Sequence, residues 1–286
     1  MTTPRLFIDV QHGLANRLRA MASAAVIAEQ AGYELVVIWR PDHHCGCHLV
    51  DVLDYPGSII SDDMGDVCRR HASRVYNYME IEPGAQVQAP ILIDPDRDRG
   101  DIYVRSSDTL NSPLRRHMAE QQFLLSLRPV PAVMDLVGAV SHPFSISAHI
   151  RMATGRDFDH LPHEAPSNWP EHRHQELSAW RAQSHFSRFV NRIDTLIGTD
   201  PEATLFLAAD LPDIYDVFAK RYADRLHILP RDLYDRSAQQ LQYALADMLL
   251  LTLSRRFLGS VGSSFSDVTA RLIDGRAPVE RSGIDF

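Results

Sequence analysis

The segment Ser145-Ile-Ser-Ala-His-Ile-Arg151 ends on two side chains that could do chemistry. In an extended strand, His149 and Arg151 point to the same face. The carboxyl end of a strand is also where doubly wound sheets bind ligands. A guanidinium there offers a fixed fork of donors that fits two phosphate oxygens. The alternative is that Arg151 forms a structural salt bridge. This segment alone does not choose between phosphate binding and a salt bridge.

A second candidate is the segment Gly259-Ser-Val-Gly-Ser-Ser-Phe-Ser266, which joins an apolar strand to a predicted helix. Glycines permit close approach of the backbone, and the free N–H groups of a helix start attract phosphate. The hydroxyls of Ser263 and Ser264 could add to such a cradle. Ser264 and Asp267 also have the spacing of a capping box with Asp in place of the usual Glu, and taken alone the segment favours simple capping.

The third candidate is Asp247, which lies in the apolar run Leu245-Ala-Asp-Met-Leu-Leu-Leu-Thr-Leu253. An unpaired buried carboxylate is costly, so we expect Asp247 to have a partner. Guanine would suit it, because the ring N–H and the exocyclic amine present two donors to one carboxylate. A structural pair with a nearby arginine is the alternative, and the sequence does not choose between the two.

The loop Gly13-Leu-Ala-Asn-Arg17 precedes the first long helix and could bring backbone N–H groups and Asn16 to a ligand. It lacks the second and third glycines of the dinucleotide fingerprint, which argues against NAD or FAD. The sequence contains no Walker motif either.

The run His43-His-Cys-Gly-Cys-His48 has metal-binding residue types. Structural zinc sites usually have wider spacing in two separated pairs, so we favour a packed or substrate-lining loop and expect no metal. The three cysteines, Cys45, Cys47 and Cys68, are an odd number for a disulfide framework and fit a reducing compartment.

Strands that alternate with helices must position these residues. The first half predicts a strand at 5–10, a helix at 18–31 and a strand at 33–39, which together form a βαβ unit. Further along it predicts short strands at 91–93 and 102–104 and helices within 114–127. The second half predicts strands at 144–150, 204–209, 226–229 and 256–259, and helices at 176–197, 212–222, 238–254 and from 264. Such alternation implies parallel sheets covered on both faces.

The length of 286 residues fits two α/β domains. Prolines at 129, 131 and 143 punctuate the passage between them, and we divide the chain into 1–140 and 141–286. The net charge of −8 argues against a general nucleic-acid or anionic-membrane binder. The first ten residues are typical of a strand and not of a signal peptide, and no apolar run could span a bilayer. We therefore expect a cytoplasmic protein.

Taken together, these segments resemble, in their order, the α1,6-fucosyltransferase and protein O-fucosyltransferase superfamily, which includes the bacterial nodulation fucosyltransferases. The resemblance covers about residues 5–55 and 144–275. It rests on Gly-x-x-Asn-Arg-Leu-Arg at 13–19, His-x-Arg at 149–151, Phe-Leu-Ala-Ala-Asp at 206–210 and an Asp247 helix that leads into Gly-Ser-Ser-Phe-Ser at 262–266.

The resemblance implies a GT-B fold, in which two Rossmann-like domains with parallel sheets face a central cleft. The first domain would be on the acceptor side and the second would hold the donor. The implied activity is inverting transfer of fucose from GDP-β-L-fucose to a hydroxyl acceptor, without a metal or other cofactor. Two alternatives stay open, namely a GT-B transferase that uses another nucleotide sugar and a non-catalytic GDP-binding protein.

By position, Arg151 resembles the arginine that holds the donor diphosphate in this superfamily, with His149 beside it. The other donor-binding residues implied by the resemblance are Gly13, Asn16, Arg17, Asp210, Asp247, Ser263, Ser264 and Phe265. The general base would come from the N-terminal half, where His12, His43, Asp9 and Asp42 lie at or near strand ends. Two positions depart from the pattern, because Ala15 stands where glycine is usual and Met152 where the α1,6 enzymes usually have a second arginine. The loop Ala153–His174 could recognise the acceptor or be an ordinary surface loop.

Overall fold

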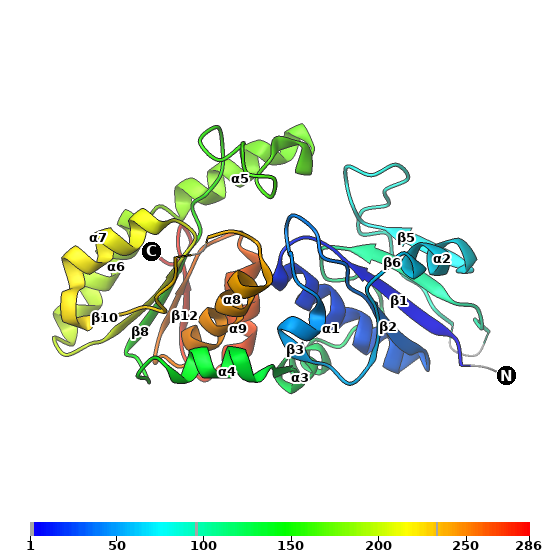
Figure 1. Cartoon of the computed structure of the whole chain (residues 1–286), viewed down its shortest axis with the longest axis horizontal. Helices are drawn as coiled ribbons and strands as arrows, with labels where there is room; N and C mark the ends of the chain where they lie inside the picture. Colours follow the sequence, from blue (N-terminus) through cyan, green and yellow to red (C-terminus); the bar gives the residue numbers. More distant parts are fainter. Residues whose placement is uncertain (1–2, 95–96, 233) are drawn as a thin grey trace. The chain divides into compact units, whose positions relative to one another are not determined.

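The computed structural model describes residues 3–94, 97–232 and 234–286. It divides into two compact units, Met1–Val130 and Pro131–Phe286 (Figure 1). The division lies before the helix α4 (Pro131–Gly138) and not after residue 140, because α4 packs against a helix of the second unit. No helix within the described ranges is long and apolar enough to cross a membrane.

The first unit is built on a five-stranded parallel sheet with the strand order β4-β2-β1-β6-β5. Its strands are β1 (Arg5–Val10), β2 (Glu34–Ile38), β4 (Ser58–Ile60), β5 (Arg74–Asn77) and β6 (Ile102–Ser106). Its helices are α1 (Leu14–Ala31), α2 (Met64–His71), α3 (His117–Ser126) and the 3-10 turn η1 (Leu49–Asp51). The antiparallel pair β3 (Leu53–Asp54) and β7 (Arg128–Pro129) completes the unit.

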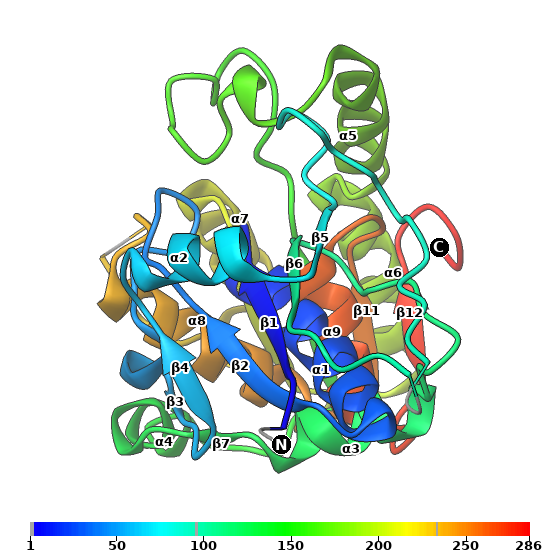
Figure 2. The same ribbon diagram turned by 90° about the vertical axis from the view of Figure 1, so that its right-hand side faces the viewer.

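Alternation along the strands explains how both faces of this sheet are covered. Phe7, Val36 and Tyr103 form a buried cluster to which α2 contributes Cys68. The helix α1 packs on β1 and β2 from the opposite face (Figure 2). Gly32 ends α1 at φ 70°, a left-handed conformation that favours glycine, and its N–H bonds to the last turn of the helix.

The second unit has a five-stranded parallel sheet with the order β10-β9-β8-β11-β12. Its strands are β8 (Ile146–Ile150), β9 (Leu205–Ala209), β10 (Leu226–His227), β11 (Phe257–Gly259) and β12 (Val279–Arg281). After α4, its helices are α5 (Glu171–Gln183), α6 (Phe186–Thr199), α7 (Pro212–Tyr222), α8 (Ala238–Leu251) and α9 (Ser264–Ile273). Short 3-10 turns are η2 (Pro166–Asn168) and η3 (Ala223–Arg225).

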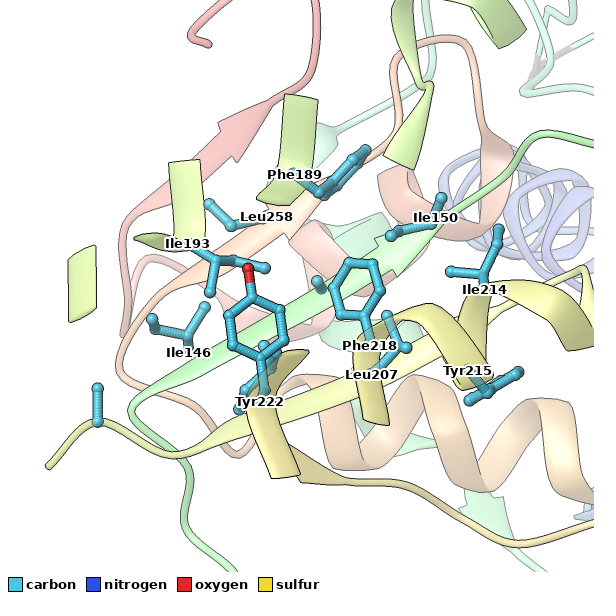
Figure 3. Packing of buried hydrophobic residues seen from close by; sticks show 13 residues of the cluster. Ile146, Ile150, Phe189, Ile193, Leu207, Ile214, Tyr215, Phe218, Tyr222 and Leu258 are labelled. Atoms are coloured by element: carbon cyan, nitrogen blue, oxygen red, sulfur yellow. The ribbon is translucent and has the colours of Figure 1, made fainter. Parts of the chain in front are cut away.

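The main core of the second unit lies between its sheet and the pair α6 and α7 (Figure 3). Ile146 and Ile150 of β8 and Leu207 of β9 meet Phe189 of α6 and Phe218 of α7 in this layer, and all five are buried. The helices α8 and α9 cover the other face of the sheet (Figure 1). These two parallel α/β units confirm the predicted α/β class with two Rossmann-like domains.

Strand order locates the position in the second unit where a ligand is expected. From β8 the chain builds outward through β9 to β10, and then returns to place β11 and β12 on the other side of β8. The order therefore reverses between β8 and β11. Doubly wound sheets bind ligands at such a switch point, outside the carboxyl ends of the strands.

Several predicted elements differ from the observed ones. The helix predicted at 176–197 is two helices, α5 and α6, which are separated at the fully buried Ser184, whose hydroxyl contacts that of Ser282 at 3.1 Å. Residues 91–93, predicted as a strand, have no regular structure. The helix α1 begins at Leu14, earlier than predicted, so Asn16 and Arg17 lie in its first turn.

Candidate functional site

His149 is buried near the end of β8, at the switch point of the second sheet. Its Nδ1 lies 2.7 Å from the hydroxyl oxygen of Ser266, and its ring stacks on Phe265 with 4.4 Å between centroids. Burial lowers the pKa of His149 to about 3, although the negative charge of Asp210 favours protonation. His149 is therefore neutral at pH 7 and fixes the start of α9 against β8.

Arg151 follows β8 directly and is held by two carboxylates. One terminal nitrogen of its guanidinium bonds to Asp210, which follows β9, and the other bonds to Glu164 from the loop before α5. Asp210 also accepts the backbone N–H groups of Met152 at 3.0 Å and Ala153 at 2.8 Å. Burial works against the charge of Arg151, but the two carboxylates outweigh it and raise its pKa. Asp210 and Arg151, both predicted for the site, are thus in contact.

The turn before α9 is hydrogen-bonded to the backbone at the end of β8. The hydroxyl of Ser260 donates to the carbonyl of His149 at 3.0 Å and accepts the N–H of Arg151 at 2.9 Å. Ser263 is the residue that caps α9, since its hydroxyl accepts the N–H of Ser266 at 3.4 Å. The cap therefore lies one position before the predicted Ser264, which is the first residue of the helix.

This arrangement puts the N-terminal end of α9 next to the buried face of His149. A helix N-terminus carries unsatisfied N–H groups and a partial positive charge, so it favours an anion. The predicted residues Ser263, Ser264 and Phe265 lie at this end, and Phe265 reaches His149. Ser260 was not among the predicted site residues, although it lies inside the segment that the sequence singles out.

Asp247 is buried in α8 and is paired with Arg231, as its apolar surroundings require. One terminal nitrogen of Arg231 lies 2.7 and 2.6 Å from the two oxygens of Asp247. Burial raises the pKa of Asp247 to about 6, although Arg231 favours the ionised form. The structural pairing that the sequence left open is therefore present here, and a role of Asp247 toward guanine stays a prediction.

The groups around Asp247 connect it to the edge of the sheet where Arg151 lies. Tyr215 connects the two regions. Its hydroxyl accepts the N–H of Ala209 at the end of β9 at 2.8 Å, and the charge of Asp247 helps to raise its pKa, after burial. Arg231 follows β10, the next strand along this edge. The carboxyl ends of β8, β9 and β10 and the start of α9 thus bring charged groups of both signs to one edge.

In the first unit, the buried side chain of Arg17 holds the loop before α1 in place. This arginine is fully buried and donates to the carbonyls of His12 and Arg40, each at 2.8 Å, and to Asp42 at 2.7 Å. Its guanidinium also lies 5.0 Å from the ring centroid of Trp39. These contacts give Arg17 a structural role in the loop, and donor binding by Arg17, Gly13 or Asn16 stays a prediction.

His12 and His43 were predicted as candidate bases. His12 adopts a left-handed φ of 61°, and its ring lies 4.7 Å from that of His44, which in turn lies 4.2 Å from that of His43. Burial lowers the pKa of His12 to about 4, so His12 is neutral at pH 7. A base is most effective when its pKa lies near the working pH, which disfavours His12 in this environment.

Asp9, the third candidate base, is fully buried at the end of β1. Its carboxylate contacts Arg40 at 2.9 Å and Arg105 at 2.6 Å, and it accepts the amide of Gln11 at 2.7 Å. These bonds make Asp9 a structural centre of the first unit. Asp42 is more accessible and is bonded to Arg17.

The cysteine-containing loop is packed and does not form a metal cluster in the described ranges. Cys45 and Cys47 are buried free thiols with their sulfurs 3.7 Å apart, and the indole N–H of Trp39 donates to the carbonyl of Cys47 at 2.9 Å. Among all residues that the structure describes, no group of three or more His, Cys, Asp or Glu side chains is arranged to hold a metal ion.

Comparison with known proteins rests on structure and not on sequence. No protein-family model matches the chain, and no curated protein matches it by sequence. A crystal structure of NodZ α-1,6-fucosyltransferase soaked with GDP-fucose aligns with a TM-score of 0.61 at 15% identity, over 94% of this chain and 93% of that chain. A structure of fucosyltransferase NodZ from Bradyrhizobium aligns with a TM-score of 0.59 at 15% identity, over 94% and 93% of the two chains.

POFUT1 in complex with GDP-fucose aligns with a TM-score of 0.56 at 12% identity, over 99% of both chains. This chain has the fold of these fucosyltransferases. The similarity extends over nearly the whole of each molecule, so both α/β units take part in it. The resemblance in fold that the sequence motifs predicted is therefore confirmed.

Proposed function

We propose that this protein is a glycosyltransferase that moves fucose from GDP-β-L-fucose to a hydroxyl acceptor. The observation that carries the proposal is the switch point of the second unit. Arg151 and the start of α9 lie there, and Asp247 is bonded to Arg231, which follows β10 of the same parallel sheet. The proposed donor is supported by the fold that the chain shares with NodZ, which was soaked with GDP-fucose, and with POFUT1, whose structure is a complex with GDP-fucose.

The proposed reaction is a direct displacement at the anomeric carbon with inversion. The acceptor oxygen forms a bond to that carbon while the bond from the carbon to the donor phosphate breaks, and GDP leaves. The proton of the acceptor hydroxyl passes to a base, for which His43 and Asp42 of the first unit are the better candidates, given the low pKa of His12 and the enclosed Asp9.

Negative charge builds up on the departing diphosphate, so catalysis needs preorganised positive potential at that point. Arg151 and the N-terminal end of α9 supply such potential from this chain alone. We therefore propose that transfer proceeds without a metal ion. Because Arg151 is bonded to Glu164 and Asp210, a bound phosphate must share Arg151 with these carboxylates or displace them.

The test is a panel of nucleotides followed by a panel of donors. Calorimetry should show binding of GDP and much weaker binding of UDP and ADP, because only guanine presents two donors to the carboxylate of Asp247. GDP-fucose should then be hydrolysed slowly or transferred to an acceptor, with release of GDP. Binding of UDP or ADP in preference to GDP would contradict the proposed donor, and GDP binding without any turnover of GDP-fucose would contradict the proposed catalysis.

A further inference from the structure

Arg181, in the last turn of α5, has a buried guanidinium whose hydrogen-bonding capacity is largely unused. Its Nε and Nη1 atoms are shielded from solvent and have no hydrogen-bond partner among the residues that the structure describes. A buried polar group without a partner is costly, and a buried charge without one costs more. Such a group calls for an acceptor that the described residues do not supply.

Arg181 lies close to the same two carboxylates as Arg151. The charges of Arg151, Asp210 and Glu164 all act on Arg181, and Arg181 in turn acts on His149. Yet the two carboxylates of this group bond to Arg151 and not to Arg181. Burial and the repulsion from Arg151 together lower the pKa of Arg181 to about 10, so the side chain is still charged at pH 7.

The end of α5 is fixed against the turn before α9. Gly262 in that turn has a φ of 61°, and a Cβ atom added to it would lie 2.2 Å from the ring of Trp180. Gly283 near the C-terminus is likewise packed, with 2.7 Å from an added Cβ to Gln183. Only glycines allow these approaches, and Trp180 and Gln183 flank Arg181 closely in the sequence. Arg181 is therefore presented by a rigid helix end beside the start of α9.

We propose that Arg181 is a second anion-binding side chain of this site and that it takes a phosphate oxygen of the donor diphosphate beside Arg151. The inference rests on the proposed function for the identity of the ligand. The terminal nitrogens of Arg151 are already bonded to carboxylates, whereas the buried Nε and Nη1 of Arg181 have no partner among the described residues. An anion between the two arginines would also relieve their mutual repulsion.

The experiment uses the full chain with Arg181→Gln, and with Arg188→Gln as the matched control, because Arg188 is an exposed arginine on the next helix. Calorimetry measures binding of GDP, guanosine and pyrophosphate, and thermal unfolding is recorded without ligand. We expect Arg181→Gln to weaken GDP and pyrophosphate about tenfold to a hundredfold and to leave guanosine unchanged. The melting temperature should stay level or rise, because an unpaired buried charge is removed.

The outcomes separate this inference from the proposed function. If the parent binds GDP and Arg181→Gln binds it equally well, the inference fails and the function stands. If Arg181→Gln melts at a lower temperature and weakens guanosine as much as GDP, Arg181 is structural and the inference fails. If the parent binds pyrophosphate but not GDP and Arg181→Gln loses pyrophosphate, the anion site is supported and the proposed function fails. A parent that binds neither overturns both.

Discussion

At the scale of single residues, Arg151 and Asp247 of the second unit are already paired, whereas Nε and Nη1 of Arg181 have no partner among the described residues. Arg151 is bonded to Asp210 and Glu164, and Asp247 to Arg231, before any ligand arrives. Buried ion pairs contribute little net stability, because desolvation offsets most of their attraction. These pairs hold each charged group in a fixed orientation, so a nucleotide would meet groups that are already positioned.

Replacing Arg151 by lysine tests the phosphate assignment without removing the charge. Lysine keeps the positive charge beside Asp210 but loses the fork that bonds two oxygens at once. We expect GDP binding about tenfold weaker, with circular dichroism unchanged. The matched control is Arg192→Lys, which alters an arginine with two bonds to Glu280 in the same unit. Equal GDP affinity in parent and Arg151→Lys, or an equal loss in the control, would contradict the assignment.

The raised pKa of Asp247 predicts a pH dependence of guanine recognition. Above a pH of about 6 the carboxylate is ionised and accepts two N–H groups, and below it the protonated group accepts fewer. Affinity should therefore fall as the pH drops from 7.5 to 5 with a midpoint near 6.

Guanosine is the ligand for this measurement, because the terminal phosphate of GDP titrates at about the same pH. Calorimetry across that range should show the fall for the parent and a weak, flat profile for Asp247→Asn. A parent profile that is flat, or that rises as the pH falls, would count against Asp247 as the guanine-binding group.

At the scale of elements, the approach of α5 to the turn before α9 depends on Gly262. Alanine there would meet both a left-handed φ of 61° and the ring of Trp180 at 2.2 Å. Gly275→Ala is the matched control, since Gly275 has a φ of 71° but nothing within 4 Å of an added Cβ. Gly275→Ala should lower the free energy of unfolding by about 1–2 kcal/mol. Gly262→Ala should lower it by about 1–3 kcal/mol more.

Chemical unfolding of both glycine variants measures this difference directly. If the two variants lose the same free energy of unfolding, the contact between Trp180 and Gly262 does not constrain the end of α5. The position of Arg181 would then need another explanation.

Long periodic elements were predictable from the sequence, and short or interrupted ones were not. β1, α1, β8 and β9 have apolar runs whose length and flanking residues define them. The break between α5 and α6 depends on a buried contact between Ser184 and Ser282, which lie far apart in the chain. No local pattern reveals such a contact.

The same limit applies to the site. Arg151, Asp210 and Ser263 lie at strand or helix ends, where the sequence pattern indicates them. Glu164 and Arg231 come from loops, and Arg181 from a helix end, so only the folded chain brings them to the edge of the sheet. The general requirement for a partner of Asp247 was predictable, but the identity of Arg231 was not.

At the scale of the whole molecule, the account predicts that GDP stabilises the full chain and that metal ions are not needed. A ligand present at one hundred times its dissociation constant adds about 2.7 kcal/mol to the free energy of unfolding. Thermal unfolding should therefore shift upward with GDP and far less with UDP. Turnover of GDP-fucose should be the same with excess EDTA as with added Mg²⁺ or Mn²⁺. Loss of turnover in EDTA that Mn²⁺ restores would contradict the metal-free mechanism.

The most direct measurement is a crystal structure of the full chain soaked with GDP-fucose. We expect the diphosphate within hydrogen-bonding distance of Arg151, Arg181 and the first N–H groups of α9, with the guanine edge on Asp247. GDP-fucose bound elsewhere on the chain, or a diphosphate that contacts neither Arg151 nor the start of α9, would contradict it.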